Sequence, residues 1–111
     1  MDIHFKSKKL QRILTNEREI TKHYGAERAR LIMRRYFFLE AAPNLARVPH
    51  TPPMRRHQLS GDLQGKFVVD VDERWRILFE PAVRPVPRRE DGGLDLCQIS
   101  AIRILDVTDY H

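Results

Sequence analysis

The spacing of apolar residues changes once along this chain, and that change restricts the fold more than any other feature. Between residues 8 and 41 apolar side chains recur every three or four positions, as they do in amphipathic helices. From residue 57 onward they mostly alternate with polar ones, as in strands that bury one face. Helical and strand patterns kept in separate parts of one chain predict an α+β fold.

The helical part divides at Gly25, because glycine adopts the left-handed conformation that many helix ends require. A first helix is expected from a cap at Ser7 to Tyr24, and a second over residues 26–41. The core face of the second contains Ala29, Ile32, Met33, Tyr36, Phe37 and Ala41. Two helices joined by so short a turn are expected to form an antiparallel hairpin.

Strand-like segments stand on both sides of the helices. The chain opens with "DIHF", and the later segments are "HQLS" (57–60), "KFVVDV" (66–71), "RWRILFEP" (74–81) and "ISAIRILDV" (99–107), with a tight turn at Asp72 and Glu73. In the third of these, Trp75, Ile77 and Phe79 share one face. The predicted architecture is a helical hairpin on one face of an antiparallel sheet, with the other face open for arginine-bearing strands.

Prolines and glycines predict loops at two places. One follows Pro43 and includes "VPHTPPMRR", and the other spans residues 81–95, as an excursion from the sheet edge. No repeat, low-complexity tract or linker divides the sequence. We therefore expect residues 1–111 to form a single domain.

The chain has 20 lysines and arginines against 15 acidic residues, a net charge of +5. This balance favours binding to polyanions or to an acidic protein, and composition does not separate the two. Cys97, the sole cysteine, excludes an internal disulfide and is expected to be a buried thiol. With no signal-like start and no apolar stretch near the roughly 18 residues that span a bilayer, a cytoplasmic protein without a membrane partner is expected.

The sequence has no glycine-rich phosphate loop and no serine-centred elbow, and the spacing of its five histidines fits no common metal site. No metal and no cofactor are therefore predicted, which leaves acid–base chemistry. Metal-free RNA cleavage needs a base, an acid and a cation near phosphorus. His57, Arg76 and the triplet Asp109, Tyr110 and His111 supply these groups if the sheet brings them together; taken singly, each is also explained as a surface or tail residue.

Two runs of the sequence, "RRHQLSGDLQGKFVVDVDERWRILFEP" and "AIRILDVTDYH", carry a family resemblance. They resemble the HigB branch of the RelE-like bacterial toxins, and the specific parts are "HQLSG", "WRILFE" and "DYH". The resemblance covers essentially the whole chain. It implies a βααβββ fold and the toxin of a type II toxin–antitoxin module, which cuts messenger RNA in the A site of the 30S ribosomal subunit. It also implies a helix-turn-helix, HigA-like antitoxin as partner.

The resemblance assigns roles to particular residues. His57, Asp109, Tyr110 and His111 match the catalytic positions, and Arg76 matches the arginine beside the scissile phosphate. By chemistry, Asp109 would orient an imidazole and Tyr110 would stack on a base or bind phosphate. Which histidine is base and which is acid stays open.

The sequence departs from the family pattern after His57. Family members often carry a lysine shortly after this histidine, whereas this chain has Gln58 and Ser60. The resemblance then implies that a cation for RNA binding comes from Lys66, Arg74 or Arg103.

Two other functions stay open. One is a ParE-like, non-catalytic inhibitor of DNA gyrase, and the other is a basic nucleic-acid-binding module without activity. Phe38 or Leu39 is a candidate contact for an antitoxin, with burial in the core as the alternative.

Overall fold

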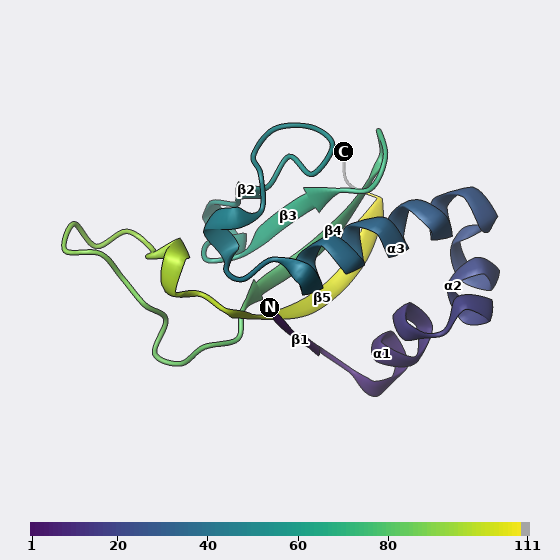
Figure 1. Ribbon diagram of the computed structural model, residues 1–111, viewed down its shortest axis with the longest axis horizontal. Coiled ribbons are helices and arrows are strands. Elements are labelled where there is room, and N and C mark those ends of the chain that lie inside the picture. The colour runs from purple at the N-terminus through teal and green to yellow at the C-terminus, as the bar shows by residue number, and fades with distance from the viewer. Residues whose placement is uncertain (110–111) are drawn as a thin grey trace.

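A computed structural model describes residues 1–109 and confirms the α+β prediction (Figure 1). Three helices precede most of a five-stranded sheet. The helices are α1 (Lys8–Thr15), α2 (Glu17–Tyr24) and α3 (Ala26–Ala41), and the strands are β1 (Asp2–Phe5), β2 (His57–Gln58), β3 (Phe67–Asp70), β4 (Trp75–Pro81) and β5 (Ala101–Asp109). Single 3-10 turns lie at Leu45–Arg47, Gly61–Leu63 and Leu96–Gln98.

The sheet has the order β1-β5-β4-β3-β2 and is mixed, where an antiparallel sheet was predicted. Strand β1 runs parallel to β5, with Asp2 opposite Ala101 and Phe5 opposite Ile104, and the other neighbours are antiparallel. The last strand in the sequence therefore lies between the first strand and β4. The predicted "HQLS" strand is only two residues long, because a 3-10 turn begins right after Ser60.

The predicted first helix is two helices that meet at Asn16. This residue has an extended backbone, with φ −123° and ψ 114°, and its side chain accepts a hydrogen bond of 3.1 Å from the backbone N–H of Glu19. It therefore ends α1 and caps α2. Helix α2 packs against both α1 and α3, so a three-helix unit replaces the predicted hairpin.

Gly25 separates α2 from α3, as predicted, in a different conformation from the one expected. Its φ of 83° is positive and its ψ of 158° is extended, which is outside the left-handed helical region. Only glycine enters this region without a steric penalty, so the chain can reverse here between two adjacent helices.

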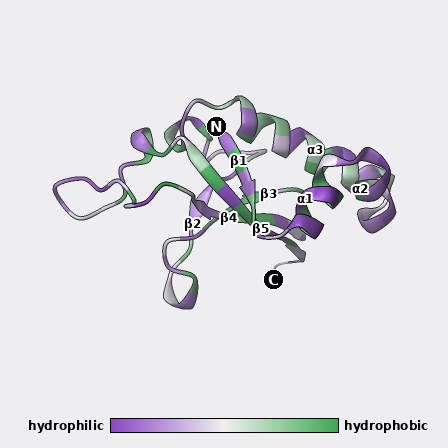
Figure 2. Cartoon of the chain, turned by 90° about the horizontal axis from the view of Figure 1, so that it is seen from below, coloured by the Kyte–Doolittle hydropathy of each residue, from purple (hydrophilic) through white to green (hydrophobic). Residues whose placement is uncertain are grey.

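The core lies between α3 and one face of the sheet. Ala29, Ile32 and Leu39 of α3 are buried in the same cluster as Val69, Phe79 and Ile104. The rings of Phe67 and Phe79 stack with centroids 5.8 Å apart. Figure 2 shows hydrophobic stretches in the strands of the sheet and a largely hydrophilic α1.

The outer face of α3 differs from its predicted core face. Phe37 was expected in the core but is 55% exposed, and Phe38 beside it is 42% exposed. Leu39 is fully buried, so of the two residues considered for antitoxin contact only Phe38 is on the surface.

Residues 82–100 connect β4 to β5, and residues 82–95 of this connection form a projecting loop (Figure 1). Because these two strands are neighbours inside the sheet, the loop leaves from the end of the sheet and not from its edge. Backbone hydrogen bonds from Arg89 to Gly93 (2.7 Å) and from Asp95 to Pro87 (2.9 Å) hold its tip. Cys97, just after this loop, is exposed, so the prediction of a buried thiol was wrong.

Candidate active site

One face of the sheet is turned away from α3, and the strand register defines which side chains it carries. Asp70, Arg76 and Thr108 lie opposite one another across three strands. The next row contains His57, Val68, Leu78 and Asp106, and a third contains Glu80, Arg103 and His4. Because side chains alternate along a strand, these rows share the face opposite Ile77 and Phe79. We call it the open sheet face.

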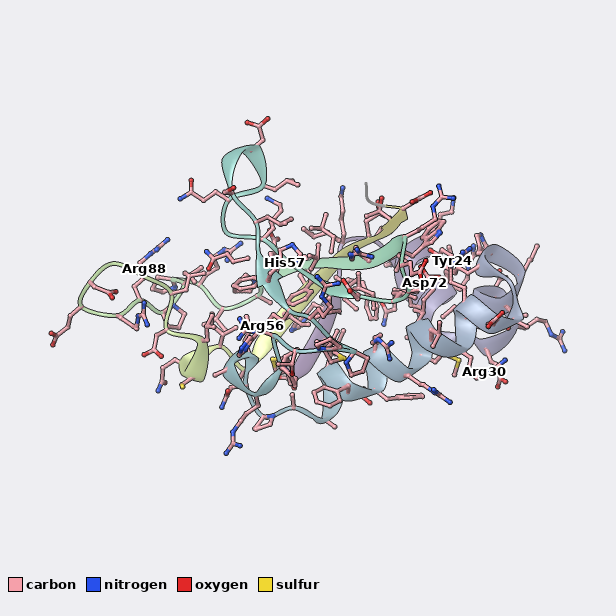
Figure 3. The ribbon with its side chains drawn as sticks, turned by 90° about the horizontal axis from the view of Figure 1, so that it is seen from above. Tyr24, Arg30, Arg56, His57, Asp72 and Arg88 are labelled. Atoms are coloured by element: carbon pink, nitrogen blue, oxygen red, sulfur yellow. The ribbon has the colours of Figure 1, made fainter. Side chains whose placement is uncertain are left out.

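The structure brings His57 and Arg76 onto this open sheet face. His57 is exposed on the edge strand β2, away from Tyr24 and Asp72 (Figure 3). Arg76 lies two strands further in and two residues further along. Strand spacing and rise place their Cα atoms about 12 Å apart. The two side chains together can reach a single phosphodiester at this separation.

Arg76 is held in place by three contacts. Its Nε lies 2.8 Å from Oδ1 of Asp70, and its Nη1 donates to the carbonyl oxygens of Asp72 (2.9 Å) and Trp75 (3.1 Å). The side chains of Arg76 and Asp70 are only 16% and 13% exposed. Such a guanidinium keeps its orientation before any substrate arrives, which is what stabilisation of a developing charge requires.

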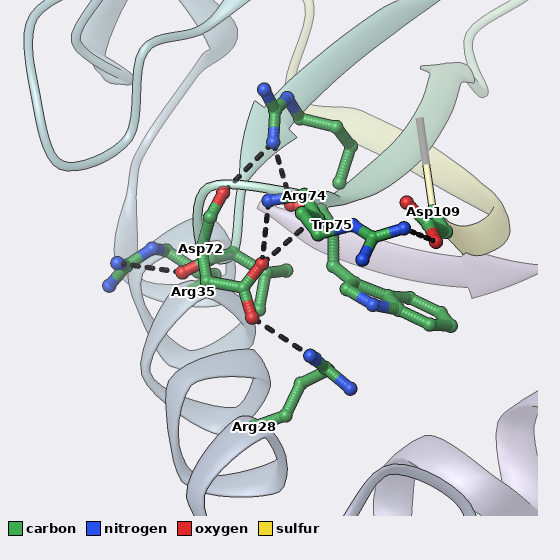
Figure 4. Close-up of polar contacts among 8 residues, drawn as sticks. Arg28, Arg35, Asp72, Arg74, Trp75 and Asp109 are labelled. Atoms are coloured by element: carbon green, nitrogen blue, oxygen red, sulfur yellow. Dashed lines mark hydrogen bonds and ion pairs between the residues drawn. The ribbon is translucent and has the colours of Figure 1, made fainter. Parts of the chain in front are cut away.

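The turn between β3 and β4 is organised by Asp72 (Figure 4). Its carboxylate accepts hydrogen bonds from the backbone N–H of Arg74 (2.9 Å) and Trp75 (2.8 Å) and from Nε of Arg28 (3.0 Å). Burial alone would raise the pKa of Asp72, but these three donors outweigh it and lower the pKa below its usual value. The Arg28 guanidinium also lies 4.9 Å from the ring centroid of Trp75.

Asp109 lies opposite Trp75 at the end of β5, on the other side of the pleat from Arg76. Its Oδ2 is 3.1 Å from Nη2 of Arg74, in an exposed ion pair (Figure 4). The register places the Cα atoms of Asp109 and His57 about 18 Å apart. Thus Asp109 does not share a face with His57 and Arg76. Tyr110 and His111 lie outside the described residues.

Of the three other predicted RNA-binding cations, two lie on or beside the open sheet face. Arg103 of β5 forms an ion pair of 3.2 Å with Glu80 across the sheet. Lys66 is half-buried and precedes Phe67, so alternation directs it to the same side as Val68. Arg74 lies instead in the β3–β4 turn and is bound to Asp109.

Sequence reasoning missed the polar residues that surround Arg76. Arg35 of α3 donates from Nε to the carbonyl oxygen of Asp70 (2.8 Å) and from Nη2 to that of Val71 (3.3 Å). Arg55 forms an ion pair of 3.4 Å with Asp70. The role of Asp72 could have been predicted from the sequence, because an aspartate at the start of a tight turn commonly accepts hydrogen bonds from the N–H groups two and three residues on. The other contacts join distant segments and leave no local pattern.

Within residues 1–109 no group of three or more His, Cys, Asp or Glu side chains is arranged to hold a metal ion. No helix in this part of the chain is long and apolar enough to cross a membrane.

Comparison with solved structures finds two similar folds. The YoeB/ParE toxin from Agrobacterium tumefaciens aligns over 100% of both chains with a TM-score of 0.57 and 11% sequence identity. A chain of the YoeB-YefM complex from Staphylococcus aureus aligns with a TM-score of 0.54 and 11% identity, over 100% of this chain and 97% of that one. No family model and no curated protein sequence matches. The likeness shows that this chain shares its α+β fold with these two structures.

Proposed function

We propose that this chain is the toxin of a type II toxin–antitoxin module and cuts messenger RNA in the ribosomal A site. The observation that carries the proposal is the open sheet face, where the exposed His57 lies within reach of the fixed Arg76 guanidinium. The fold shared with YoeB/ParE toxins supports the same class. The assignment to the HigB branch rests on the motifs "HQLSG", "WRILFE" and "DYH".

The proposed reaction needs no metal. A base removes the proton of the ribose 2′-hydroxyl, the O2′–phosphorus bond forms, and the phosphorus–O5′ bond breaks as an acid protonates O5′. The products are a 2′,3′-cyclic phosphate and a 5′-hydroxyl end. His57 and His111 take the two proton-transfer roles in this proposal, and Arg76 stabilises the extra negative charge on phosphorus.

The remaining site residues act on either side of this phosphate. Asp109 orients an imidazole, Tyr110 stacks on a base or binds phosphate, and Lys66, Arg74 and Arg103 bind RNA. The mechanism requires residues 110 and 111 to close much of the 18 Å gap estimated between Asp109 and His57. Two residues span at most about 7 Å, so the proposal requires the two imidazole side chains and the phosphate between them to bridge the remaining distance.

Translation in vitro with primer extension on the message tests this mechanism. His57→Ala and His111→Ala are each expected to slow cleavage by about 100-fold or more, the usual contribution of a positioned acid or base. His50→Ala is the matched control, because His50 is an exposed histidine outside the open sheet face. Cleavage by the first two variants at the control rate would rule the mechanism out.

A second candidate function follows from the name of the Agrobacterium neighbour, a YoeB/ParE toxin. ParE-like proteins inhibit DNA gyrase by binding and lack the acid–base residues. A gyrase supercoiling assay beside the translation assay separates the two. We expect translation to stop and supercoiling to continue.

The partners in this proposal are the ribosome with its message and a helix-turn-helix, HigA-like antitoxin, all in the cytoplasm. The alignment with a chain from a YoeB-YefM complex supports a protein partner. Growth arrest on expression, relieved by co-expression of a neighbouring small helix-turn-helix gene, is the expected result.

A further inference from the structure

A groove of 340 Å³ lies where α3, the turn at residues 52–55 and the β3–β4 turn meet. Three arginines from three separate segments line it: Arg35, Arg55 and Arg76. Pro52 and Pro53 form part of its wall. We call it the arginine groove.

Three arginines and three carboxylates line the arginine groove. The carboxylate of Asp70 forms ion pairs with both Arg76, at 2.8 Å, and Arg55, at 3.4 Å. Arg35 donates to two backbone carbonyls, which carry no net charge to offset its own. The other lining carboxylates are Asp72, which pairs with Arg28, and Glu73. Because Asp72 pairs with Arg28, which lies outside the lining, the three lining arginines stand against the two remaining carboxylates, Asp70 and Glu73.

Arg55 lies in the groove at a conformational cost. Its φ of 46° is in the left-handed region, and among the described residues it is the one non-glycine with positive φ. Arginine is disfavoured there because its Cβ crowds the backbone. The side chain is 61% exposed and forms a long ion pair with Asp70. Backbone strain at a residue that forms only a weak contact within the protein is typical of residues that bind a ligand.

The arginine groove adjoins His57. Asp70 lies two residues along β3 from Val68, the residue opposite His57, which places the Cα atoms of Asp70 and His57 about 8 Å apart. Arg55 itself is two residues before His57 in the sequence. An RNA strand cut beside His57 would therefore carry a neighbouring phosphate to this groove.

We propose that the arginine groove binds the phosphate next to the scissile one, with Arg55 as its principal ligand and Arg35 and Arg76 beside it. A guanidinium forks onto phosphate oxygens with two parallel hydrogen bonds, so Arg55 exchanges its 3.4 Å contact with Asp70 for a stronger one. This inference takes its RNA substrate from the proposed function. It assigns Arg55 to binding and not to proton transfer.

Fluorescence anisotropy with a labelled 12-nucleotide single-stranded RNA tests the groove without the ribosome. Arg55→Gln is expected to weaken binding about fivefold or more and to reduce the slope of log affinity against log salt by about 0.7, the loss of one phosphate contact. Arg18→Gln removes the same charge from an exposed position on α2. It is expected to change affinity less than twofold.

Arg55→Gly separates binding from folding. Glycine relieves the strained backbone, so the thermal midpoint is expected to stay the same or rise while RNA affinity falls as in Arg55→Gln. A lower midpoint in Arg55→Gly would show that Arg55 is structural and would overturn the proposal.

Two further results would overturn it. One is an equal loss of RNA affinity in Arg55→Gln and Arg18→Gln, and the other is unchanged RNA affinity with loss of binding to a protein partner. If the parental chain binds RNA but fails to cleave on the ribosome, the proposed function is contradicted, while the comparison of the two variants still decides the role of the groove.

Discussion

At the scale of single residues, Asp72 connects Arg76 of the candidate site to the β3–β4 turn and to helix α3. Its carboxylate joins the backbone of Arg74 and Trp75, two and three residues on, to Arg28 of α3. Its carbonyl oxygen accepts from Arg76. One residue thus fixes the turn, the helix and the guanidinium that we place at the phosphate.

The lowered pKa of Asp72 predicts a pH-dependent contribution to stability. A carboxyl whose folded pKa lies below its unfolded value, about 3.9, stabilises the protein above that value and loses this contribution as pH falls through the folded pKa. Asp72→Asn is expected to unfold about 1–3 kcal/mol more easily at pH 7. Urea unfolding should show this difference shrinking below about pH 4. A difference independent of pH would contradict the assignment.

The role of Arg76 can be tested by a substitution that keeps its positive charge. Arg76→Lys retains one positive charge but cannot reproduce three directed contacts, because an ammonium is a point charge without the guanidinium fork. Ribosomal cleavage is expected to fall about 100-fold or more. Arg74→Lys, in the neighbouring exposed ion pair, should lose much less. Equal losses would mean that charge alone matters.

At this scale the sequence predicts interactions between residues close together in the chain, but not contacts between distant segments. The tight turn at Asp72 and Glu73 was predicted because its signal lies within a few residues. Once the strand register is known, the alternation of side chains places His57 and Arg76 on the same face of the sheet. The register itself cannot be predicted from the sequence pattern. Arg35, Arg55 and Asp70 meet only through the tertiary fold, so sequence spacing holds no sign of their contact.

At the scale of elements, Asn16 decides how the helical region is divided. The sequence carries the signal, because Asn16 followed by Glu19 matches the pattern of a helix start, but the apolar face continues across it and suggested one helix. The continuing face gave no information on the break because α1 and α2 both pack inward, with Ile13, Leu14 and Ile20 buried.

Asn16→Ala is expected to lower the free energy of unfolding by about 1 kcal/mol, since the N–H of Glu19 loses its acceptor. Asn16→Asp keeps an acceptor and should cost little. Chemical denaturation of the two variants measures the difference. A cost that is the same for both would show that the cap is not what matters.

Two adjacent residues of helix α3 are expected to differ strongly in their contribution to stability. Leu39→Ala is expected to cost about 2–5 kcal/mol, because Leu39 is 0% exposed within the core. Phe38→Ala, at 42% exposure, should change stability by about 0.5 kcal/mol or less. Thermal or urea unfolding compares them. If Phe38→Ala also weakens antitoxin binding, the outer face of α3 belongs to that interface; unchanged binding excludes it.

At the scale of the whole molecule, the sheet joins the two ends of the described chain. Strands β3, β4 and β5 have a neighbour on each side, although that of β3 on one side is only the two-residue β2, and β1 and β2 are the edges. Hydrogen exchange is therefore expected to be slowest in β4 and β5 and much faster in β2. Fast exchange at Ile77 and Ile104 would contradict this order.

The parallel pairing of β1 with β5 is the part of the topology that the sequence did not predict. Alternation along "DIHF" indicated a strand but not its neighbour or direction. Parallel neighbours need a long crossover, and here almost the whole chain serves as the connection. The predicted strand segments all appear in the sheet, although their number and order do not follow from periodicity alone.

The position of β5 also sets when the molecule can assemble during synthesis. Translation delivers β1 first and β5 last of the five strands, yet β5 occupies the gap between β1 and β4. Until residues 101–109 emerge from the peptide tunnel, β1 has no neighbour and β4 has one bare edge. The nascent polypeptide therefore holds an incomplete open sheet face while it is being made.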